Sequence, residues 1–441
     1  MDSGDAAWRS RAVCGTEYTC CRAAPGGTGT ALHALRLSRV GTAAAEAAVR
    51  SLQTAHPVLR AHLCGSSSSP TLAFPPSSSP QLSLEPQPSA LDFHSLLERE
   101  INRNPWAAAE HGPNGVPVLF VALYELPGGG AALFVLIHTV VCDRAASEAL
   151  LTELLALLAG DDPEVKEEAA AVEAGLEKRI PKKDARKPLW ARGVDMVGYS
   201  INGLRTSTLP FQDTGTARST QMVRLGFGRD DTTRLMDACK ENGVKLSSAM
   251  AAAILLAVRL SKKLDSGQQE TYSVATMINC RQFLEPPLDD HNVGFFHSAI
   301  ANTHKMNREE ELWALARRCH DSYSNAKNNK KHLTDIRDLN FLMCRAIENP
   351  QLTLRTGLVT VFEEPVTHDT SDLQSRAGVE DYVYGLTMHG AGPSIAVFDS
   401  IRDGQLRCAC MYPSPLHSRK QMQEIFDKVK LILVQGSTAM K

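Results

Sequence analysis

The chain has 441 residues, enough for two domains of ordinary size or for one large domain with two cores. Its 47 basic and 49 acidic side chains give a formal net charge of -2, and its pI is near 6.7. This balance provides no broad electrostatic attraction to nucleic acid or to an anionic membrane, so we expect small molecules or other proteins as partners.

The eleven cysteines are scattered along the chain without paired CxxC spacing. This usage is typical of reduced thiols and argues against a disulfide framework or a zinc site. The N-terminal MDSGDAAWRSR has two early acidic residues and no apolar core, unlike a signal or transit peptide. The longest apolar runs, around 115–142 and 248–258, are interrupted before they reach spanning length. We therefore expect a cytoplasmic protein that does not enter a membrane.

The first half of the chain mixes strands with helices. Its predicted elements are a helix over 42–55, strands over 58–63, 72–74, 81–84, 116–124 and 131–138, and a helix over 144–158. The last two strands are joined by the glycine-rich ELPGGGA, which predicts an antiparallel hairpin. The strand over 131–138 is apolar on both faces, so we expect it in the centre of its sheet.

The middle of the chain differs in composition from both halves. Residues 160–216 are charged, then basic (KRIPKKDARK, 178–187), then aromatic and mixed. The basic run fits either a nuclear import signal or a solvated linker, and a linker is the simpler interpretation. We therefore expect an N-terminal lobe over 1–160, a crossover linker over 161–216 and a C-terminal lobe over 217–441.

The second half repeats the mixture of elements. Helices are predicted over 231–242, 247–264, 307–326, 334–347 and 417–435, and strands over 271–279, 296–301, 353–362, 381–388, 394–398 and 405–411. Strands and helices that alternate in both halves predict an α/β or α+β protein of two lobes.

His138 is the candidate catalytic residue. It follows the apolar strand in FVLIHTVVCDR (134–144). Catalytic histidines often occur where a rigid strand ends, because the strand holds the base beside an open cleft. A single histidine in this place is also common as a structural residue, and its local sequence leaves both readings open.

HTVVCDR (138–144) resembles the HHxxxDG motif of the condensation-domain superfamily of acyltransferases, which includes peptide-synthetase condensation domains, alcohol acetyltransferases and the plant HxxxD acyl-CoA transferases. Three more stretches agree with this family in the same order: LQTAHPVLRAHL (52–63), MINCRQFLEPPLDDHNVGFFHSAI (277–300) and GQLRCACMYPSPLHSRKQMQEIFDKVKLIL (404–433). The pattern as a whole looks most like a group of uncharacterised plant proteins of this superfamily. The DFGWG sequence of the plant acyl-CoA transferases is missing.

The resemblance implies two lobes similar to chloramphenicol acetyltransferase, each a mixed β-sheet flanked by helices, in a V with a tunnel between them. It implies an acyltransferase that moves an acyl group from acyl-CoA to an alcohol or amine. Acyl-CoA would be a co-substrate, and we expect a monomer with no permanently bound cofactor or metal. The alternative is a non-catalytic descendant that binds a small metabolite or a protein partner in the tunnel.

The resemblance also assigns roles within the motif. If Asp143 takes the aspartate position, His138 takes the first histidine and Thr139 takes the second, which is the catalytic one in the family. Neighbouring residues on a strand point to opposite faces, so only a bulge would turn His138 and Thr139 the same way. By resemblance, Asp143 is a structural residue paired with Arg281.

Further candidates surround the implied tunnel. Arg144 replaces the family's glycine beside the channel for the thioester arm, where it would obstruct the channel, hold a phosphate or carboxylate, or point to solvent. His297, Ser298 and His389 are candidates for the tunnel wall, and both histidines are otherwise ordinary residues at strand ends.

Overall fold

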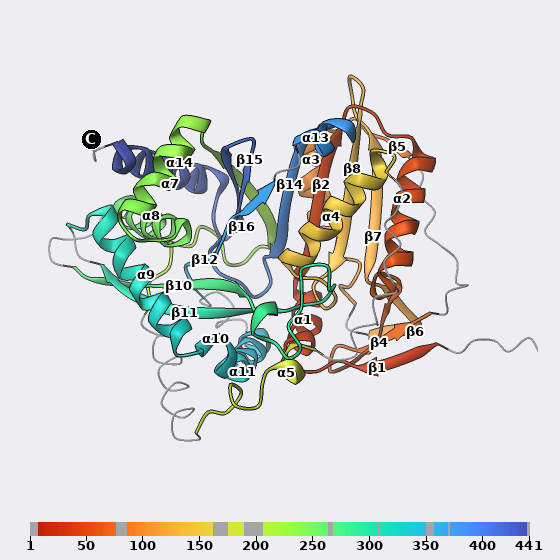
Figure 1. Cartoon of the computed structure of the whole chain (residues 1–441), viewed down its shortest axis with the longest axis horizontal. Coiled ribbons are helices and arrows are strands. Elements are labelled where there is room, and N and C mark those ends of the chain that lie inside the picture. Colours follow the sequence, from red (N-terminus) through yellow and green to blue (C-terminus); the bar gives the residue numbers. More distant parts are fainter. Residues whose placement is uncertain are drawn as a thin grey trace, which may run out of the picture. The chain divides into compact units, whose positions relative to one another are not determined.

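The computed structural model describes residues 8–75, 86–108, 110–161, 175–188, 206–262, 268–306, 309–349, 357–368 and 371–438. The chain forms two compact units (Figure 1). Unit 1 comprises Met1–Arg179, Leu284–Phe296 and Thr370–Thr387, and unit 2 comprises Ile180–Phe283, His297–Asp369 and Met388–Lys441. The predicted strand at 81–84 and the linker segments 162–174 and 189–205 lie outside the described residues.

Unit 1 contains two sheets. Its strands are β1 (Arg9–Ala12), β2 (Thr28–Leu37), β3 (His62–Ser66), β4 (Ser69–Phe74), β5 (Pro86–Pro88), β6 (Glu110–Pro117), β7 (Leu119–Glu125), β8 (Ala131–His138) and β14 (Val379–Met388). The larger sheet has the order β14-β2-β8-β7-β5, and the smaller has the order β1-β4-β3-β6. As predicted, β7 and β8 form an antiparallel hairpin and β8 is a central strand, buried along its whole length. β14 comes from the second half of the chain, so the unit is not formed by the first half alone.

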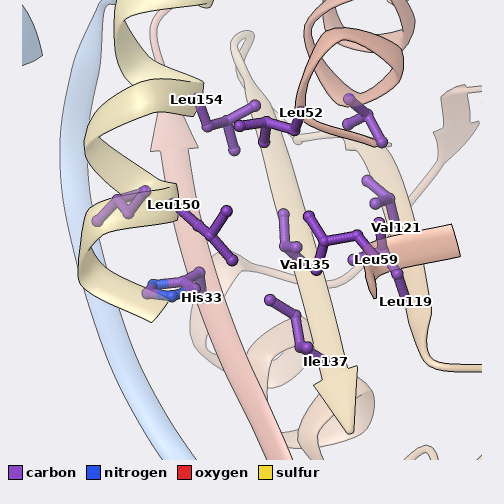
Figure 2. Close-up of a pocket in the computed structure, with 11 residues that line it drawn as sticks. His33, Leu52, Leu59, Leu119, Val121, Val135, Ile137, Leu150 and Leu154 are labelled. Atoms are coloured by element: carbon purple, nitrogen blue, oxygen red, sulfur yellow. The ribbon is translucent and has the colours of Figure 1, made fainter. Parts of the chain in front are cut away.

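Helices cover both faces of the larger sheet. The helices of unit 1 are α1 (Thr16–Ala23), α2 (Thr42–Ala55), α3 (Phe93–Ile101), α4 (Arg144–Leu158), α5 (Leu176–Arg179) and α13 (Ser371–Arg376). α2 and α4 lie side by side, and between them and the sheet is a small cavity lined by His33 and apolar side chains of α2, α4, β7 and β8 (Figure 2). The volume of this cavity that is open to the centre of a water molecule is about 20 Å³. This is room for about one water. This cavity is a packing gap and is too small for an acyl chain.

Unit 2 is built on one sheet with the order β11-β10-β12-β15-β16-β9, and β13 also pairs with β15. Its strands are β9 (Ser219–Gly226), β10 (Glu270–Asn279), β11 (His297–Met306), β12 (Val359–Phe362), β13 (Val366–His368), β15 (Ile395–Arg402) and β16 (Gln405–Ser414). Its helices are α7 (Arg229–Glu241), α8 (Leu246–Ser261), α9 (Leu312–Asn328), α10 (Lys331–Thr334), α11 (Ile336–Glu348) and α14 (Arg419–Thr438). α8 is buried on nearly every side, as its apolar sequence predicts, and it packs between α9 and α14.

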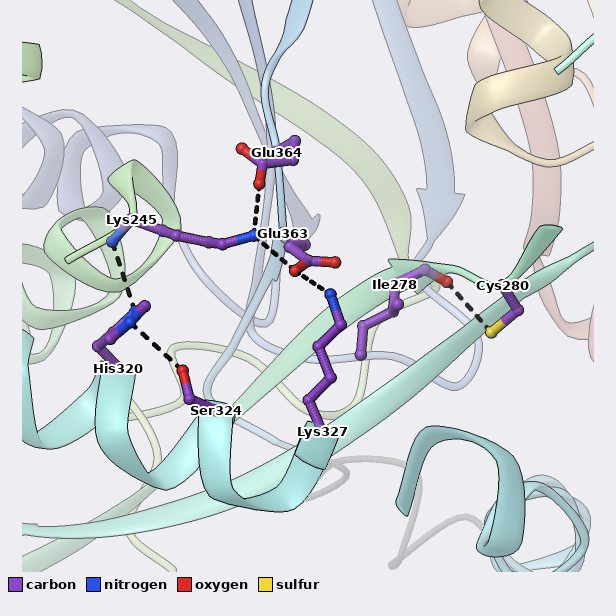
Figure 3. A network of polar contacts seen from close by, with 8 residues as sticks. All are labelled: Lys245, Ile278, Cys280, His320, Ser324, Lys327, Glu363 and Glu364. Carbon is purple, nitrogen blue, oxygen red and sulfur yellow. Dashed lines mark hydrogen bonds and ion pairs between the residues drawn. The ribbon is translucent and has the colours of Figure 1, made fainter. Parts of the chain in front are cut away.

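A polar cluster joins the end of β12 to two helices of unit 2. Lys245, at the start of α8, donates to the Glu363 carboxylate at 2.6 Å, and Lys327 of α9 donates to the same oxygen (Figure 3). Burial acts to raise the pKa of Glu363, but hydrogen bonds from both lysines and from Tyr323, together with the charge of Lys245, outweigh it and lower the pKa to about 2. Because both lysines are engaged by carboxylates, we assign this cluster a structural role.

Most predicted elements are found close to their predicted bounds. The helix over 144–158 agrees with α4 to the residue, and the helix over 42–55 agrees with α2. The strand over 58–63 is wrong in part, because Pro57–Arg60 forms a 3-10 turn and β3 begins only at His62. Pro57 fixes its own φ at a helical value and favours this turn. Together these elements give a mixed α/β fold with sheets flanked by helices, as predicted.

Among the helices that the structure describes, none is by itself both long enough and apolar enough to span a membrane.

Candidate functional site

The motif segment, residues 138–144, connects the end of β8 to the start of α4. Val135 and Ile137 of β8 line the cavity under α2 and α4 (Figure 2). Side chains alternate along a strand, so His138 lies on the other face of the sheet. There the ring of Trp106 meets the imidazole edge-on, with ring centroids 4.9 Å apart. His138 therefore lies on a packed interior face of the sheet.

His138 is held as a neutral imidazole. It is fully buried, and its Nδ1 accepts a hydrogen bond from the Val140 N–H at 2.9 Å. The ring proton is then on Nε2, because a neutral imidazole has one donor and one acceptor nitrogen. Burial lowers the pKa of His138 to about 3, with a smaller contribution from His111. In this state His138 has no free basic nitrogen with which to accept a proton from a substrate.

His138 should therefore not titrate between pH 5 and pH 8. Its folded pKa is about 3, below its ordinary value of 6.5. The stability that its neutral form contributes is therefore present above about pH 6.5 and is lost as the pH falls toward 3. Imidazole ¹⁵N chemical shifts should show a constant Nε2–H tautomer over this range. A titration with a midpoint near 6.5 would contradict this assignment.

Thr139 lies beside α1, away from the Trp106 ring. Its N–H donates to the Gly29 carbonyl at 2.9 Å, and its hydroxyl forms a hydrogen bond with the Cys20 thiol. Gly29 has a φ of 111°, and a Cβ there would lie 2.9 Å from the Thr139 Oγ1, so glycine is required at this close approach. Burial raises the pKa of Cys20 to about 12, although the bond with Thr139 acts to lower it. Cys20 is therefore a neutral thiol and not an activated nucleophile.

Asp143 fixes the motif segment with both carboxylate oxygens. Oδ1 accepts from the Ala146 N–H at 3.0 Å and caps α4, while Oδ2 accepts from the Phe296 N–H at 2.7 Å. The Asp143 N–H also donates to the Gly294 carbonyl at 3.1 Å. These bonds tie the motif segment to the returning segment Leu284–Phe296 of unit 1. Asp143 thus has structural contacts of the kind that the resemblance implies, and its pairing with Arg281 stays a prediction.

Arg144 is only 5% exposed, which excludes the alternative of an arginine that points to solvent. It is the first residue of α4, and its charge acts on Glu148 one turn later. An arginine and a glutamate four residues apart lie on the same face of a helix, so the sequence already indicates that Arg144 and Glu148 are neighbours.

The other candidates belong to unit 2. Arg281 is buried, and its guanidinium donates to the Asn279 side chain at 3.2 Å. His297 pairs with Asn279 across β10 and β11, so the fold brings Arg281 and His297 to the same end of this hairpin. Ser298 is the next residue of β11 and is also buried. Among the candidates of unit 2, these three are therefore neighbours.

His389 is half-buried and is oriented by a hydroxyl. Its Nδ1 lies 3.0 Å from the Oγ1 of Thr220, which also accepts the Met388 N–H at 3.0 Å. Burial, with a contribution from Arg218, lowers the pKa of His389 to about 4. His389 is therefore neutral at physiological pH. In the described part of the chain, no group of three or more His, Cys, Asp or Glu side chains is placed to hold a metal ion.

The sequence and the fold can now be compared with known proteins. The family model for the phthiocerol/phthiodiolone dimycocerosyl transferase C-terminus matches residues 216–326. No curated protein matches the chain at a significant level.

Solved structures match nearly the whole chain. The TRI3 trichothecene 15-O-acetyltransferase from Fusarium sporotrichioides is similar with a TM-score of 0.76 at 13% identity, over 99% of this chain and 96% of that one. Polyketide synthase associated protein 5 from Mycobacterium tuberculosis has a TM-score of 0.69 at 16% identity, over 98% and 99% of the two chains. The X-domain from teicoplanin biosynthesis has a TM-score of 0.62 at 16% identity, over 96% and 93%. The chain therefore has the fold shared by condensation domains and acyltransferases.

Proposed function

We propose that this protein moves an acyl group from an acyl-CoA to the hydroxyl or amine of a small acceptor, without His138 as the base. The acceptor oxygen or nitrogen would attack the thioester carbonyl carbon. The new C–O or C–N bond forms, the C–S bond breaks, and the proton of the acceptor ends on the departing CoA thiol. The fold and the family match over residues 216–326 support the reaction class.

The observation that carries this proposal is the double hydrogen bond of Asp143, which keeps the motif segment in a defined shape. A general base contributes about 10²–10⁴-fold to a rate, whereas positioning supplies up to about 7–11 kcal/mol of the barrier. A protein that keeps the scaffold and lacks the histidine base would therefore transfer slowly but measurably.

A second candidate is a binding protein without turnover. It is favoured by Thr139, which stands where the resemblance expects the catalytic histidine and is engaged with Gly29 and Cys20. A solved structure similar to this chain is the complex of the X-domain and OxyB from teicoplanin biosynthesis, so this fold also occurs in a protein–protein complex. In this candidate the ligand is a small metabolite or a protein partner.

The test is to incubate the purified protein with a mixture of acyl-CoAs and a set of small alcohols and amines, and to identify products by mass spectrometry. We expect slow product formation that is unchanged in His138→Gln, because the imidazole is not the proton acceptor. Thr139→His should increase the rate by up to about 10²–10⁴-fold if it presents a free imidazole, and Thr139→Gln is the control of similar size without one.

The possible outcomes separate the two candidates. Loss of product in His138→Gln, with unchanged thermal unfolding, would show that His138 is the base after all. An acyl-CoA or acceptor that stays bound without any product would favour the binding protein. If no product forms and no small molecule stays bound, both acyl transfer and the binding of these small molecules are refuted.

A further inference from the structure

Beneath the first turns of α4 lies a chain of hydrogen-bonded side chains that we call the α4 relay: Ser147 and Glu148 of α4, His33 of β2 and Tyr382 of β14. The Tyr382 hydroxyl donates to the Glu148 carboxylate at 2.8 Å and lies 3.1 Å from the Nδ1 of His33. The Nε2 of His33 is hydrogen-bonded to the Ser147 hydroxyl. His33 and Ser147 are almost completely buried. The relay thus joins three elements of unit 1, with its His33 and Ser147 end in the core and with Glu148 and Tyr382 half-buried.

The protonation of Glu148 sets the direction of every bond in the relay. While the carboxylate is ionised it only accepts, so Tyr382 donates to it and must accept from the Nδ1–H of His33. The Nε2 of His33 then accepts from Ser147. A protonated Glu148 can instead donate to Tyr382, which frees the phenol to donate to Nδ1 and moves the imidazole proton to Nε2. In that state Ser147 becomes an acceptor, and the whole relay has reversed.

Charged and titratable groups on α4, β14 and β2 face Glu148, while on α2, which packs on α4, Glu46 and Arg50 pair with each other. Arg144 lies one turn earlier on α4, and Tyr382 and Tyr384 face it from β14. His33 reaches it from β2 through Tyr382. On α13, which also packs on α4, Arg376 pairs with Asp161, beyond the far end of the helix.

Burial raises the pKa of Glu148 to about 7, although the charge of Arg144 and the Tyr382 hydrogen bond act to lower it. Its folded value thus lies above its ordinary value of 4.5. The stability linked to the protonated form is fully present below about pH 4.5 and is lost as the pH rises through 7.

The relay is in contact with the motif segment through Arg144 and Asp143. Arg144 is the last residue of that segment, and its charge faces Glu148. The Ser147 N–H donates to the Asp143 carbonyl at 2.9 Å, in the same helical turn that Asp143 caps. We propose that Glu148 acts through the α4 relay as a positioning residue for the motif segment, whose hydrogen bonding changes when this carboxyl group gains or loses a proton. The consequence for acyl transfer rests on the proposed function, whereas the consequence for the motif segment does not.

The test is amide hydrogen exchange of the full-length protein between pH 5.5 and pH 8.5, corrected for intrinsic exchange rates and followed in peptides that cover residues 138–148. We expect the protection of these amides to fall about tenfold as the pH rises, with a midpoint near pH 7. A tenfold fall in protection corresponds to a linked pKa shift of at least one unit. Glu148→Gln should remove this transition. Tyr382→Phe should move the midpoint upward, because the carboxylate loses a donor.

Glu46→Gln is the matched control. Glu46 forms an exposed pair with Arg50 four residues away on α2, and its replacement should leave the transition unchanged. The same transition in wild type and in Glu148→Gln would overturn the proposal, as would a wild type without any transition. If Glu148→Gln does not fold, Tyr382→Phe is the remaining test, and a transition midpoint that is unchanged in this variant would also overturn the proposal. A transition without any acyl transfer would refute the proposed function and leave the positioning role standing.

Discussion

Asp143→Ala should destabilise unit 1 by about 3 kcal/mol. The substitution removes both acceptors of a buried carboxylate and leaves the N–H groups of Ala146 and Phe296 without them. Each buried donor that loses its partner costs about 1–3 kcal/mol. The loss should appear in urea unfolding of the full-length protein as a lower midpoint. Amide exchange should localise it to the start of α4 and to the segment that contains Phe296.

Two variants test this reasoning. Asp143→Asn keeps one side-chain oxygen that can cap α4 but offers the Phe296 N–H no second acceptor, so its loss should be intermediate. Asp92 caps α3 through one bond to the Ser95 N–H at 2.7 Å and is exposed, so Asp92→Ala should cost clearly less than Asp143→Ala. Equal losses at Asp92 and Asp143 would mean that the bond to Phe296 contributes nothing.

Lys187→Met should destabilise unit 2 by about 3–5 kcal/mol, which is the usual cost of removing one partner from a buried ion pair. The Lys187 Nζ donates to Asp335 at 2.7 Å and to Asp338 at 3.1 Å, and Asp335 is 1% exposed. Without the lysine, two carboxylates face each other with much less compensating charge. The loss should shrink at acidic pH, because a carboxylate without its partner takes up a proton more easily.

Thermal and urea unfolding at neutral and acidic pH measure this effect. Lys183→Met, in the same basic run but with an exposed side chain, is the control and should have little effect. A loss at Lys187 no larger than at Lys183 would show that the buried pairs make no net contribution.

Lys187 also shows where sequence reasoning reached its limit. The composition of the run KRIPKKDARK favours a solvated linker, and Lys182 and Lys183 are exposed. Its last lysine is buried against two aspartates that follow it by about 150 residues. A run of charged residues has the same composition whether its side chains face water or a distant carboxylate. Composition therefore could not distinguish the buried Lys187 from its exposed neighbours.

Local patterns were reliable where the chain itself decides the structure. The helix of α4 begins and ends where its apolar period predicts, and β8 is central because it is apolar on both faces. The similarity of HTVVCDR to the motif also identified the segment that joins β8 to α4. The helix and the strand depend on periodicities that any short window of the sequence contains, whereas the motif was identified by its resemblance to the family.

The state of His138 depended on tertiary contacts. The sequence places it at the end of a strand, but Trp106 and the Val140 N–H determine that its ring is buried and which nitrogen carries the proton. The α4 relay was missed for the same reason. His33 lies in an apolar strand of the first half of the chain, whereas Tyr382 comes from β14, some 350 residues later.

The sequence by itself determined the mixed α/β class, most helices and strands, the motif segment and its departures at Thr139 and Arg144. Only the tertiary structure decided that β14 completes the sheet of unit 1, that Asp143 binds the Phe296 N–H, and that Glu148 belongs to a partly buried relay. The physical reason is that propensity and periodicity act over a few residues. The burial and hydrogen bonding that set a side chain's charge arise from segments that meet only in the folded chain.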